Sequence, residues 1–191
     1  PVNGDLGRKL IDALADEDTI NGDGGDEALV GNRGNDSINA GAGDDLVFGD
    51  AGDDTINGDE GEDTLFGDGG EDTINGGADD DTAYGGDKND LISGGTGNDT
   101  MNGGAGSDTL TGGAGADTFI FFAADASTGT DVITDFELGV DIIQLAGATG
   151  ATITYDGNIN QVSISIGTDV VTLINSVNDL SGFDGSDIAF I

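Results

Sequence analysis

The 191-residue sequence contains no cysteine, no histidine and no tryptophan, and only four basic residues. Without cysteine, neither disulfide bonds nor thiolate zinc sites can form within the chain. Without histidine, a HExxH zinc-protease motif, a Ser/His/Asp triad and any imidazole base are excluded. The 39 acidic residues far outnumber the basic ones, which makes a nucleic acid a poor partner. We therefore expect no enzyme active site in this chain and no nucleic-acid partner.

Long hydrophobic runs are also missing, so we expect no membrane span. None of the glycine-rich stretches continues into GK[ST], which argues against a phosphate-binding loop despite the 37 glycines. A net charge of −35 with 5% aromatic residues is typical of a disordered acidic chain. We expect that disordered state whenever no metal is bound.

The dominant feature of the sequence is a nine-residue unit that recurs eleven times without a gap over residues 22–120, as in GDAGDDTIN from Gly49. The first and fourth positions are glycine in most copies, the sixth is acidic and the eighth is apolar. A fixed period of this kind indicates a repeat architecture in which identical units stack on one another.

The residue types at these positions suit a tight turn around a hard cation. Glycine supplies backbone conformations with φ > 0 and close backbone approach, and a carboxylate supplies two hard oxygen ligands. The last three residues alternate as a strand does, so the apolar eighth residue points inward. The candidate metal ligands are the sixth-position residues Glu27, Asp36, Asp45, Asp54, Asp63, Asp72, Asp81, Asp90, Asp99, Asp108 and Asp117.

The unit resembles the GGxGxDxUx calcium-binding repeat of the RTX (repeats-in-toxin) family over about half of the chain. The resemblance implies an all-β fold, a right-handed parallel β-roll in which six residues of each unit turn around Ca²⁺ and three form a short strand. It also implies Ca²⁺ as the cofactor and an extracellular, bacterial location reached by type I secretion.

Alternate repeats differ at the ninth position, which predicts 18 residues and two strands per coil. One set reads Val30, Phe48, Phe66, Tyr84, Asn102 and Ile120, and the other reads Asn39, Asn57, Asn75, Ser93 and Thr111. One outer face should therefore carry an aromatic stripe. Exposed aromatic rows mark docking surfaces for a domain, a sugar or a second copy. Alternatively, the C-terminal segment or an N-terminal helix covers the stripe.

Stacked turns leave room for about nine Ca²⁺ ions between successive coils. The single row of inward side chains is too small to offset the entropy of ordering the repeats, so we expect calcium to supply much of the folding free energy. Weak sites are expected at Glu27 and over residues 79–92. There Asp79 and Lys88 replace the fourth-position glycine, and Ala83 thins the core.

Residues 1–21 are predicted to form an N-terminal cap that ends in a degenerate repeat. A short helix is predicted by the near-helical spacing of Leu6, Leu10, Ile11 and Leu14, with a frayed linker as the alternative. Residues 13–21 keep Asp18 and Ile20 at the ligand and core positions. Both glycine positions are lost, however, so calcium binding there is doubtful.

Residues 121–191 are predicted to form a C-terminal cap. Residues 131–145 resemble the segment that follows the repeats in secreted RTX proteins, and Asp135 and Asp141 there are either ligands of a last calcium or solvated surface residues. Alternation over residues 152–155, 162–166 and 170–174 predicts antiparallel strands joined by hairpins. Such strands would close the apolar end of the roll. The final residues, DIAFI, resemble the ends of proteins exported by type I secretion.

The resemblance implies a module of a larger secreted protein that stays unfolded at low cytosolic calcium and folds outside the cell. Its partners would be calcium, the type I secretion apparatus and an N-terminal functional domain. One alternative is a polysaccharide-binding or enzyme-positioning module similar to those of alginate epimerases. Another is an adhesin or ice-binding segment, although only Thr96 with Asn98 has the turn form of such repeats. A glycosidase is disfavoured because calcium accounts for the paired carboxylates.

Overall fold

The computed structural model describes residues 2–3, 10–122, 129–147, 152–156, 161–166, 169–174 and 188–190, with side chains over residues 10–122 and 129–147. Every regular element in these ranges is a β-strand. No helix long and apolar enough to cross a membrane is present in the part of the chain that the structure describes.

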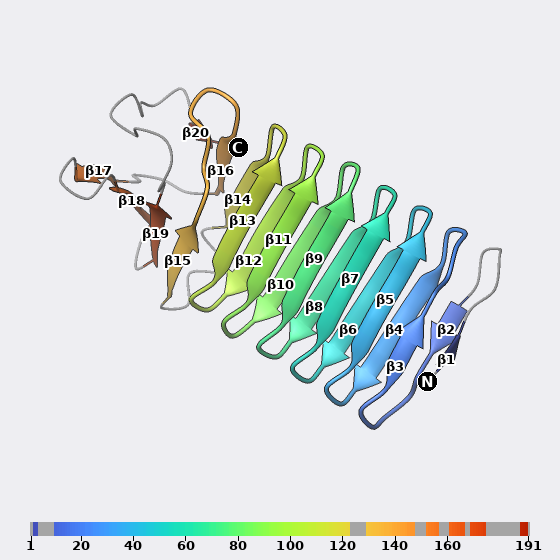
Figure 1. Cartoon of the computed structure of the whole chain (residues 1–191). Coiled ribbons are helices and arrows are strands. Elements are labelled where there is room, and N and C mark those ends of the chain that lie inside the picture. The colour runs from blue at the N-terminus through green and yellow to red at the C-terminus, as the bar shows by residue number, and fades with distance from the viewer. Residues whose placement is uncertain are drawn as a thin grey trace.

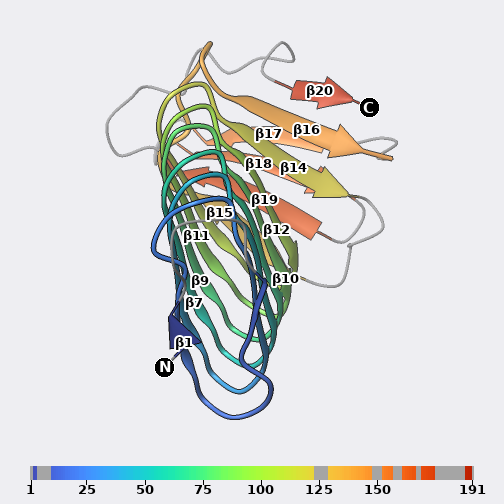
Figure 2. The same cartoon turned by 90° about the vertical axis from the view of Figure 1, so that its right-hand side faces the viewer.

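The strands form two sheets that face each other across a flattened coil, with the repeats stacked along one axis (Figure 1, Figure 2). The eleven-stranded sheet has, in spatial order, β1 (Val2–Asn3), β3 (Thr19–Asn21), β5 (Ser37–Ala42), β7 (Thr55–Glu60), β9 (Thr73–Ala78), β11 (Leu91–Thr96), β13 (Thr109–Ala114), β15 (Thr130–Ile133), β19 (Asp169–Ile174), β18 (Gln161–Ile166) and β17 (Thr152–Asp156). The nine-stranded sheet has β2 (Leu10–Asp12), β4 (Ala28–Arg33), β6 (Leu46–Ala51), β8 (Thr64–Gly69), β10 (Thr82–Asp87), β12 (Thr100–Ala105), β14 (Thr118–Phe122), β16 (Ile142–Ala146) and β20 (Ile188–Phe190).

Strand pairing within the repeats follows the predicted 18-residue coil. Ile56 of β7 lies opposite Ile38 on one side and Ile74 on the other, in parallel register. Strands β4 to β13 each span six residues rather than the expected three, because the register continues from the last three positions of one unit into the first three of the next. Asp59, for example, is still paired with Gly41 and Gly77. The parallel β-roll is thus confirmed, with longer strands and shorter turns.

The core consists of a row of eighth-position side chains from each sheet, enclosed between the two sheets. All of them are at most 2% exposed: Leu29, Ile38, Val47, Ile56, Leu65, Ile74, Ala83, Ile92, Met101, Leu110 and Phe119. The row continues toward the C-terminal end, where the rings of Phe119 and Phe136 lie 6.2 Å apart. The core therefore extends beyond the last recognisable repeat.

The predicted N-terminal helix is wrong where the structure describes it. Leu10–Asp12 form strand β2, which pairs with β4 and places Ile11 beside Leu29 in the core. A few apolar residues at helical spacing do not stabilise an isolated short helix, whereas the edge of a sheet offers backbone hydrogen-bonding partners. Leu6 lies outside the described residues. In the degenerate repeat, residues 13–21, the side chain of Ile20 is buried. Leu14, the second residue of this unit, has a positive φ of 79°.

The predicted C-terminal hairpins are confirmed as antiparallel pairs of β17 with β18 and of β18 with β19. Strand β19 also pairs in parallel with β15, so the three strands extend the eleven-stranded sheet beyond the roll. From the end of the chain, Ile188–Phe190 form β20 and pair with β16. The two sheets are therefore lengthened by different parts of the C-terminal segment.

Candidate metal centre

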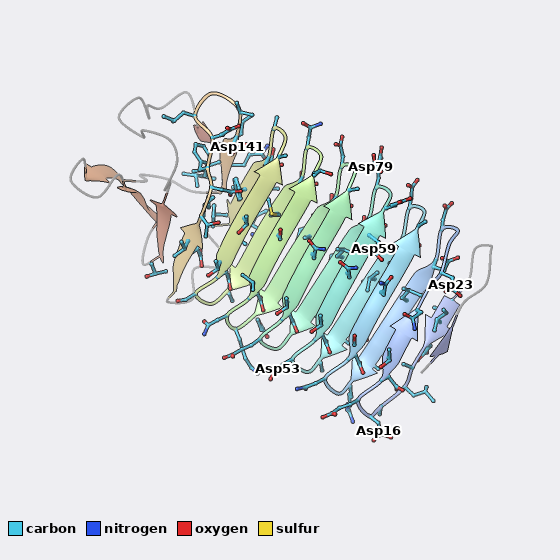
Figure 3. The ribbon with its side chains drawn as sticks, viewed as in Figure 1. Asp16, Asp23, Asp53, Asp59, Asp79 and Asp141 are labelled. Carbon is cyan, nitrogen blue, oxygen red and sulfur yellow. The ribbon has the colours of Figure 1, made fainter. Side chains whose placement is uncertain are left out.

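The sixth-position acidic residues stand in two columns, one along each edge of the roll. The first column, which precedes strands of the eleven-stranded sheet, contains Asp36, Asp54, Asp72, Asp90 and Asp108. The second, which precedes strands of the nine-stranded sheet, contains Glu27, Asp45, Asp63, Asp81, Asp99 and Asp117. Their side chains are only 1–3% exposed. Figure 3 shows the two edges, with Asp16 and Asp53 along one and Asp79 and Asp141 along the other.

Each aspartate of a column binds the coil that precedes it. Asp54 Oδ1 accepts a hydrogen bond from the backbone N–H of Asp36 at 2.7 Å, and Asp72 Oδ1 accepts one from Asp54 N–H at 2.7 Å. The same contact recurs in the second column, for example from Asp45 N–H to Asp63 Oδ1 at 2.8 Å. These bonds hold every carboxylate in the same orientation from coil to coil.

The fifth-position side chains form a second ladder in the opposite direction. Asp53 Oδ1 accepts from the N–H of Glu71 in the following coil at 2.9 Å, and Asn98 Oδ1 accepts from Ala116 N–H at 3.0 Å. The exposed turn backbone is therefore satisfied from one side by the fifth residue and from the other by the sixth. The two positions differ in burial, because the fifth residue is exposed and the sixth is buried.

The second carboxylate oxygen of these aspartates is buried and lacks a hydrogen-bond partner. Within the described residues this holds for Oδ2 of Asp36, Asp45, Asp54, Asp63, Asp72, Asp81, Asp90, Asp99 and Asp108. An ionised buried carboxylate oxygen without a partner is costly, so a whole column of ionised carboxylates is compatible with folding only if positive charge lies alongside.

Burial raises the pKa of these carboxyl groups, against the opposing effect of the backbone hydrogen bond to Oδ1. The pKa values of Asp63, Asp81 and Asp90 rise to about 7, and neighbouring carboxylates contribute to the rise. Those of Asp54 and Asp117 rise to about 6 for the same reasons. Without a cation, folding therefore makes these carboxyl groups harder to ionise, and a bound positive charge would favour the ionised form.

The glycine at the first position makes space for oxygen atoms to converge. A methyl group placed on Gly49 would lie 2.5 Å from Asp54 Oδ2 and 2.9 Å from the carbonyl oxygen of Gly67 in the next coil. Carboxylate and carbonyl oxygens are the donors that Ca²⁺ prefers. In the described parts of the chain no three acidic side chains form a cage of their own. The backbone carbonyls must therefore complete each site, and this donor set fits calcium.

The turns at Asp79 and Lys88 are strained, although the strands beside them stay in register. Both residues have positive φ, at 79° and 78°, in place of glycine. The hydrogen bonds that glycines of the preceding coils donate to these turns are long. They measure 3.2 Å from Gly61 N–H to Ala78 O and 3.4 Å from Gly70 N–H to Asp87 O. The equivalent bond from Gly43 to Glu60 O is 2.8 Å. The expected irregularity is thus confined to the turns.

The aromatic stripe is a stack of parallel rings. Phe66 lies between Phe48 and Tyr84, with ring centroids 5.0 and 4.9 Å apart and planes within 6°. Neither predicted cover is found in the described residues: Leu10–Asp12 are a strand, and strands β17 to β19 join the other sheet. Each ring is instead half-buried on the outer face of the nine-stranded sheet, with the faces of Phe66 occupied by its neighbours.

The sequence matches the RTX calcium-binding nonapeptide repeat family in four copies, over residues 3–38, 21–56, 48–83 and 84–119. The chain belongs to this family. Its repeats are therefore calcium-binding repeats, and the resemblance inferred from the nonapeptide is confirmed. The RTX repeat is a calcium-binding module and not a catalytic domain. No curated protein sequence matches the chain.

Several solved structures are similar to this RTX chain. The crystal structure of the extracellular lipase LipA from Serratia marcescens is 17% identical with a TM-score of 0.40, and the match covers 81% of this chain but only 40% of the lipase. The solution structure of the AlgE6R2 subunit of the Azotobacter vinelandii mannuronan C5-epimerase is 28% identical, with a TM-score of 0.45 and coverage of 73% and 88%. The AlgE6R3 subunit is 23% identical, with a TM-score of 0.42 and coverage of 78% of each chain.

Two aspartates beyond the repeats lie in line with the columns: Asp131, which the repeat pattern missed, and Asp141, one of the two predicted candidates for a last calcium, which is buried rather than solvated. Asp131 Oδ1 accepts a hydrogen bond from Asp108 N–H, and Asp141 Oδ1 accepts one from Asp117 N–H, both at 3.0 Å. Each begins a D-x-apolar triplet, DVI or DII, and that triplet was the available signal. Asp135, the other predicted candidate, accepts hydrogen bonds from the N–H groups of Gly112 and Gly113 in β13 and lies outside the columns.

Proposed function

We propose that this chain is a calcium-gated folding module of a secreted bacterial protein. The observation that carries the proposal is the column of buried carboxylate oxygens without partners in a chain of net charge −35. At low cytosolic calcium these carboxylates repel one another and the chain stays extended and can be threaded through an export channel. Outside the cell, calcium at about millimolar concentration fills sites of typical extracellular affinity, and the roll forms.

The proposed ligands are the sixth-position carboxylates together with backbone carbonyls of the turns, and about nine Ca²⁺ ions would lie between successive coils. The ligand residues are Glu27, Asp36, Asp45, Asp54, Asp63, Asp72, Asp81, Asp90, Asp99, Asp108 and Asp117. Calcium bound there supplies the positive charge that the desolvated columns need. The aspartates use Oδ1 to fix the coil and keep Oδ2 for the ion.

The proposed partners are the type I secretion apparatus and an N-terminal functional domain of the parent protein, with the region 121–191 serving as cap and export signal. Folding outside would prevent the chain from sliding back. The aromatic stripe gives little support to the alternative of a sugar-binding module, because the faces of Phe66 are taken by its neighbours. Asp50, Asp68 and Asp87 line the groove beside it and would repel an anionic polysaccharide.

Circular dichroism during a calcium titration tests the proposal, with magnesium at the same concentrations as the control. We expect a cooperative gain of β signal with calcium alone, reversed by a chelator. A chain that is already compact in chelator, or that responds equally to magnesium, would contradict it. Export is tested separately by fusing a passenger protein to residues 120–191 and measuring its secretion by a type I system.

A further inference from the structure

Residues 129–134 continue the roll beyond the family match, which ends at residue 119. Their sequence, GTDVIT, has the order of the second half of a repeat. In β15, Ile133 lies opposite Leu110 and is fully buried, at the place of an eighth-position residue. Thr130 N–H donates to Ser107 Oγ at 2.9 Å, which continues the fifth-position ladder. These contacts make Gly129 to Thr134 a cryptic half-repeat.

Residues 139–144, GVDIIQ, form a second cryptic half-repeat on the other edge of the roll. Ile143 of β16 lies opposite Phe119 and is fully buried. Gly139 has φ 73°, and Ile142 N–H donates to Asp117 O at 2.8 Å, as the seventh residue does in each coil. The two half-repeats do not continue the 18-residue period of the sequence. Asp131 follows Asp108 by 23 residues, and Asp141 follows Asp117 by 24.

The space between Asp108 and Asp131 reproduces the arrangement found between successive repeats. Asp108 is 1% exposed, and its Oδ2 is buried without a partner, as in the eight preceding aspartates of the two columns. Asp131 is 7% exposed and accepts Asp108 N–H through Oδ1, the same contact that links Asp54 to Asp36. An orphaned carboxylate oxygen thus meets another buried carboxylate, and when both groups are ionised they need a cation between them.

The equivalent space beyond Asp117 is closed by hydrogen bonds. Asp141 Oδ1 accepts from Asp117 N–H at 3.0 Å, and its Oδ2 accepts from Glu137 N–H at 2.7 Å. Asp117, unlike Asp108, has no buried carboxylate oxygen lacking a partner among the described residues. A backbone N–H therefore takes the place of a cation at the end of this column.

We propose that the roll binds one additional Ca²⁺ between Asp108 and Asp131, where the repeats join the C-terminal segment, and that the other column ends at Asp141 without an ion. This inference rests on the proposed calcium binding of the columns. Its consequence is that the last coil is tied to the C-terminal segment by a metal on one edge and by hydrogen bonds on the other.

The test is the number of calcium ions bound per chain at saturation, measured by equilibrium dialysis and atomic emission for the wild-type chain, Asp131→Asn and Asp141→Asn. In Asp131→Asn the new amide side chain keeps an oxygen to accept Asp108 N–H but lacks the second carboxylate oxygen. We expect Asp131→Asn to bind one ion fewer and Asp141→Asn to bind as many as the wild type. A crystal of the wild-type chain grown with Mn²⁺ should show an anomalous peak beside Asp108 and Asp131 and none between Asp117 and Asp141.

The outcomes separate the two proposals. A wild-type chain that binds no calcium would overturn both. Calcium binding by the wild type with the same ion count in Asp131→Asn, or an anomalous peak beside Asp141, would overturn only the inference about the junction. If Asp131→Asn fails to fold, the anomalous map of the wild-type chain decides the question without it.

Discussion

Asp54 Oδ1 accepts a 2.7 Å hydrogen bond from the N–H of Asp36, eighteen residues earlier, while Asp54 Oδ2 is buried with no partner. One carboxylate thus joins two coils through one oxygen, while its other oxygen is available for the cation proposed above. The exposed fifth-position residue Asp53 joins its coil to the following one in the same way. Because the two oxygens of Asp54 differ in this way, the contribution of a metal to stability can be measured separately from that of the hydrogen bond.

Asp54→Asn should weaken calcium-dependent folding. The amide oxygen can still accept Asp36 N–H, but the charged second oxygen is lost. At millimolar calcium the loss of one site of extracellular affinity should cost about 0.5–1.5 kcal/mol of unfolding free energy. Urea unfolding at fixed calcium measures this, with Asp53→Asn as the matched control. Equal effects of the two substitutions would show that Oδ2 of Asp54 holds no ion.

The calcium-free chain should become more compact as the pH is lowered. Because the folded-state pKa values of Asp63, Asp81 and Asp90 are raised to about 7, their contribution to folding is fully present below the unfolded value near 4 and is lost as the pH rises through 7. Circular dichroism and small-angle scattering in chelator between pH 8 and pH 5 measure the effect. With saturating calcium the dependence should reverse, since protons compete with the ion. A calcium-free chain that is equally extended at both pH values would contradict the raised pKa values.

Gly52→Ala should be strongly destabilising. Gly52 has φ 147°, and an added methyl group would overlap the carbonyl oxygen of Gly34 in the preceding coil. Strain and overlap together should cost about 2–4 kcal/mol. Gly69→Ala is the control, because its methyl group would meet only Asp50 O at 3.4 Å. Thermal unfolding at saturating calcium should separate the two, and similar melting temperatures would refute the close approach of the turns.

Lys88→Gly should stabilise the roll. Lys88 holds φ 78°, which costs a side chain with a Cβ about 1 kcal/mol relative to glycine. Its ion pair with Asp53, at 3.8 Å and well exposed, offsets little of this. Lys88→Ala removes the charge but keeps the Cβ, and should not gain stability. Melting temperatures at saturating calcium test the ranking; a gain shared by both variants would assign the effect to charge.

Phe66→Ala should destabilise the nine-stranded sheet more than a single exposed ring would. The substitution removes both stacking contacts, with Phe48 and Tyr84, and should cost about 1–3 kcal/mol. Tyr84→Phe keeps all three rings and serves as the control. Unfolding in urea at saturating calcium measures both. Wild-type stability in Phe66→Ala would mean that the stack contributes nothing.

Most of the fold and of the candidate site follows from the sequence alone, because every unit has the same residue types at the same positions. Glycine at fixed places sets the turn, the eighth residue sets the core, and the difference between alternate ninth residues sets two strands per coil. The carboxylates could be assigned to two columns for the same reason. Their individual oxygen roles could not, since these depend on a neighbour eighteen residues away.

The sequence by itself determined the 18-residue coil and the two acidic columns, since each is a property of a unit repeated with its own chemistry. Only the tertiary structure decided where the roll begins and ends. Leu10–Asp12 became a strand because the edge of β4 was there to pair with it. Asp131 and Asp141 joined the columns because the stacked coil before them offered an N–H group, whatever the number of residues between.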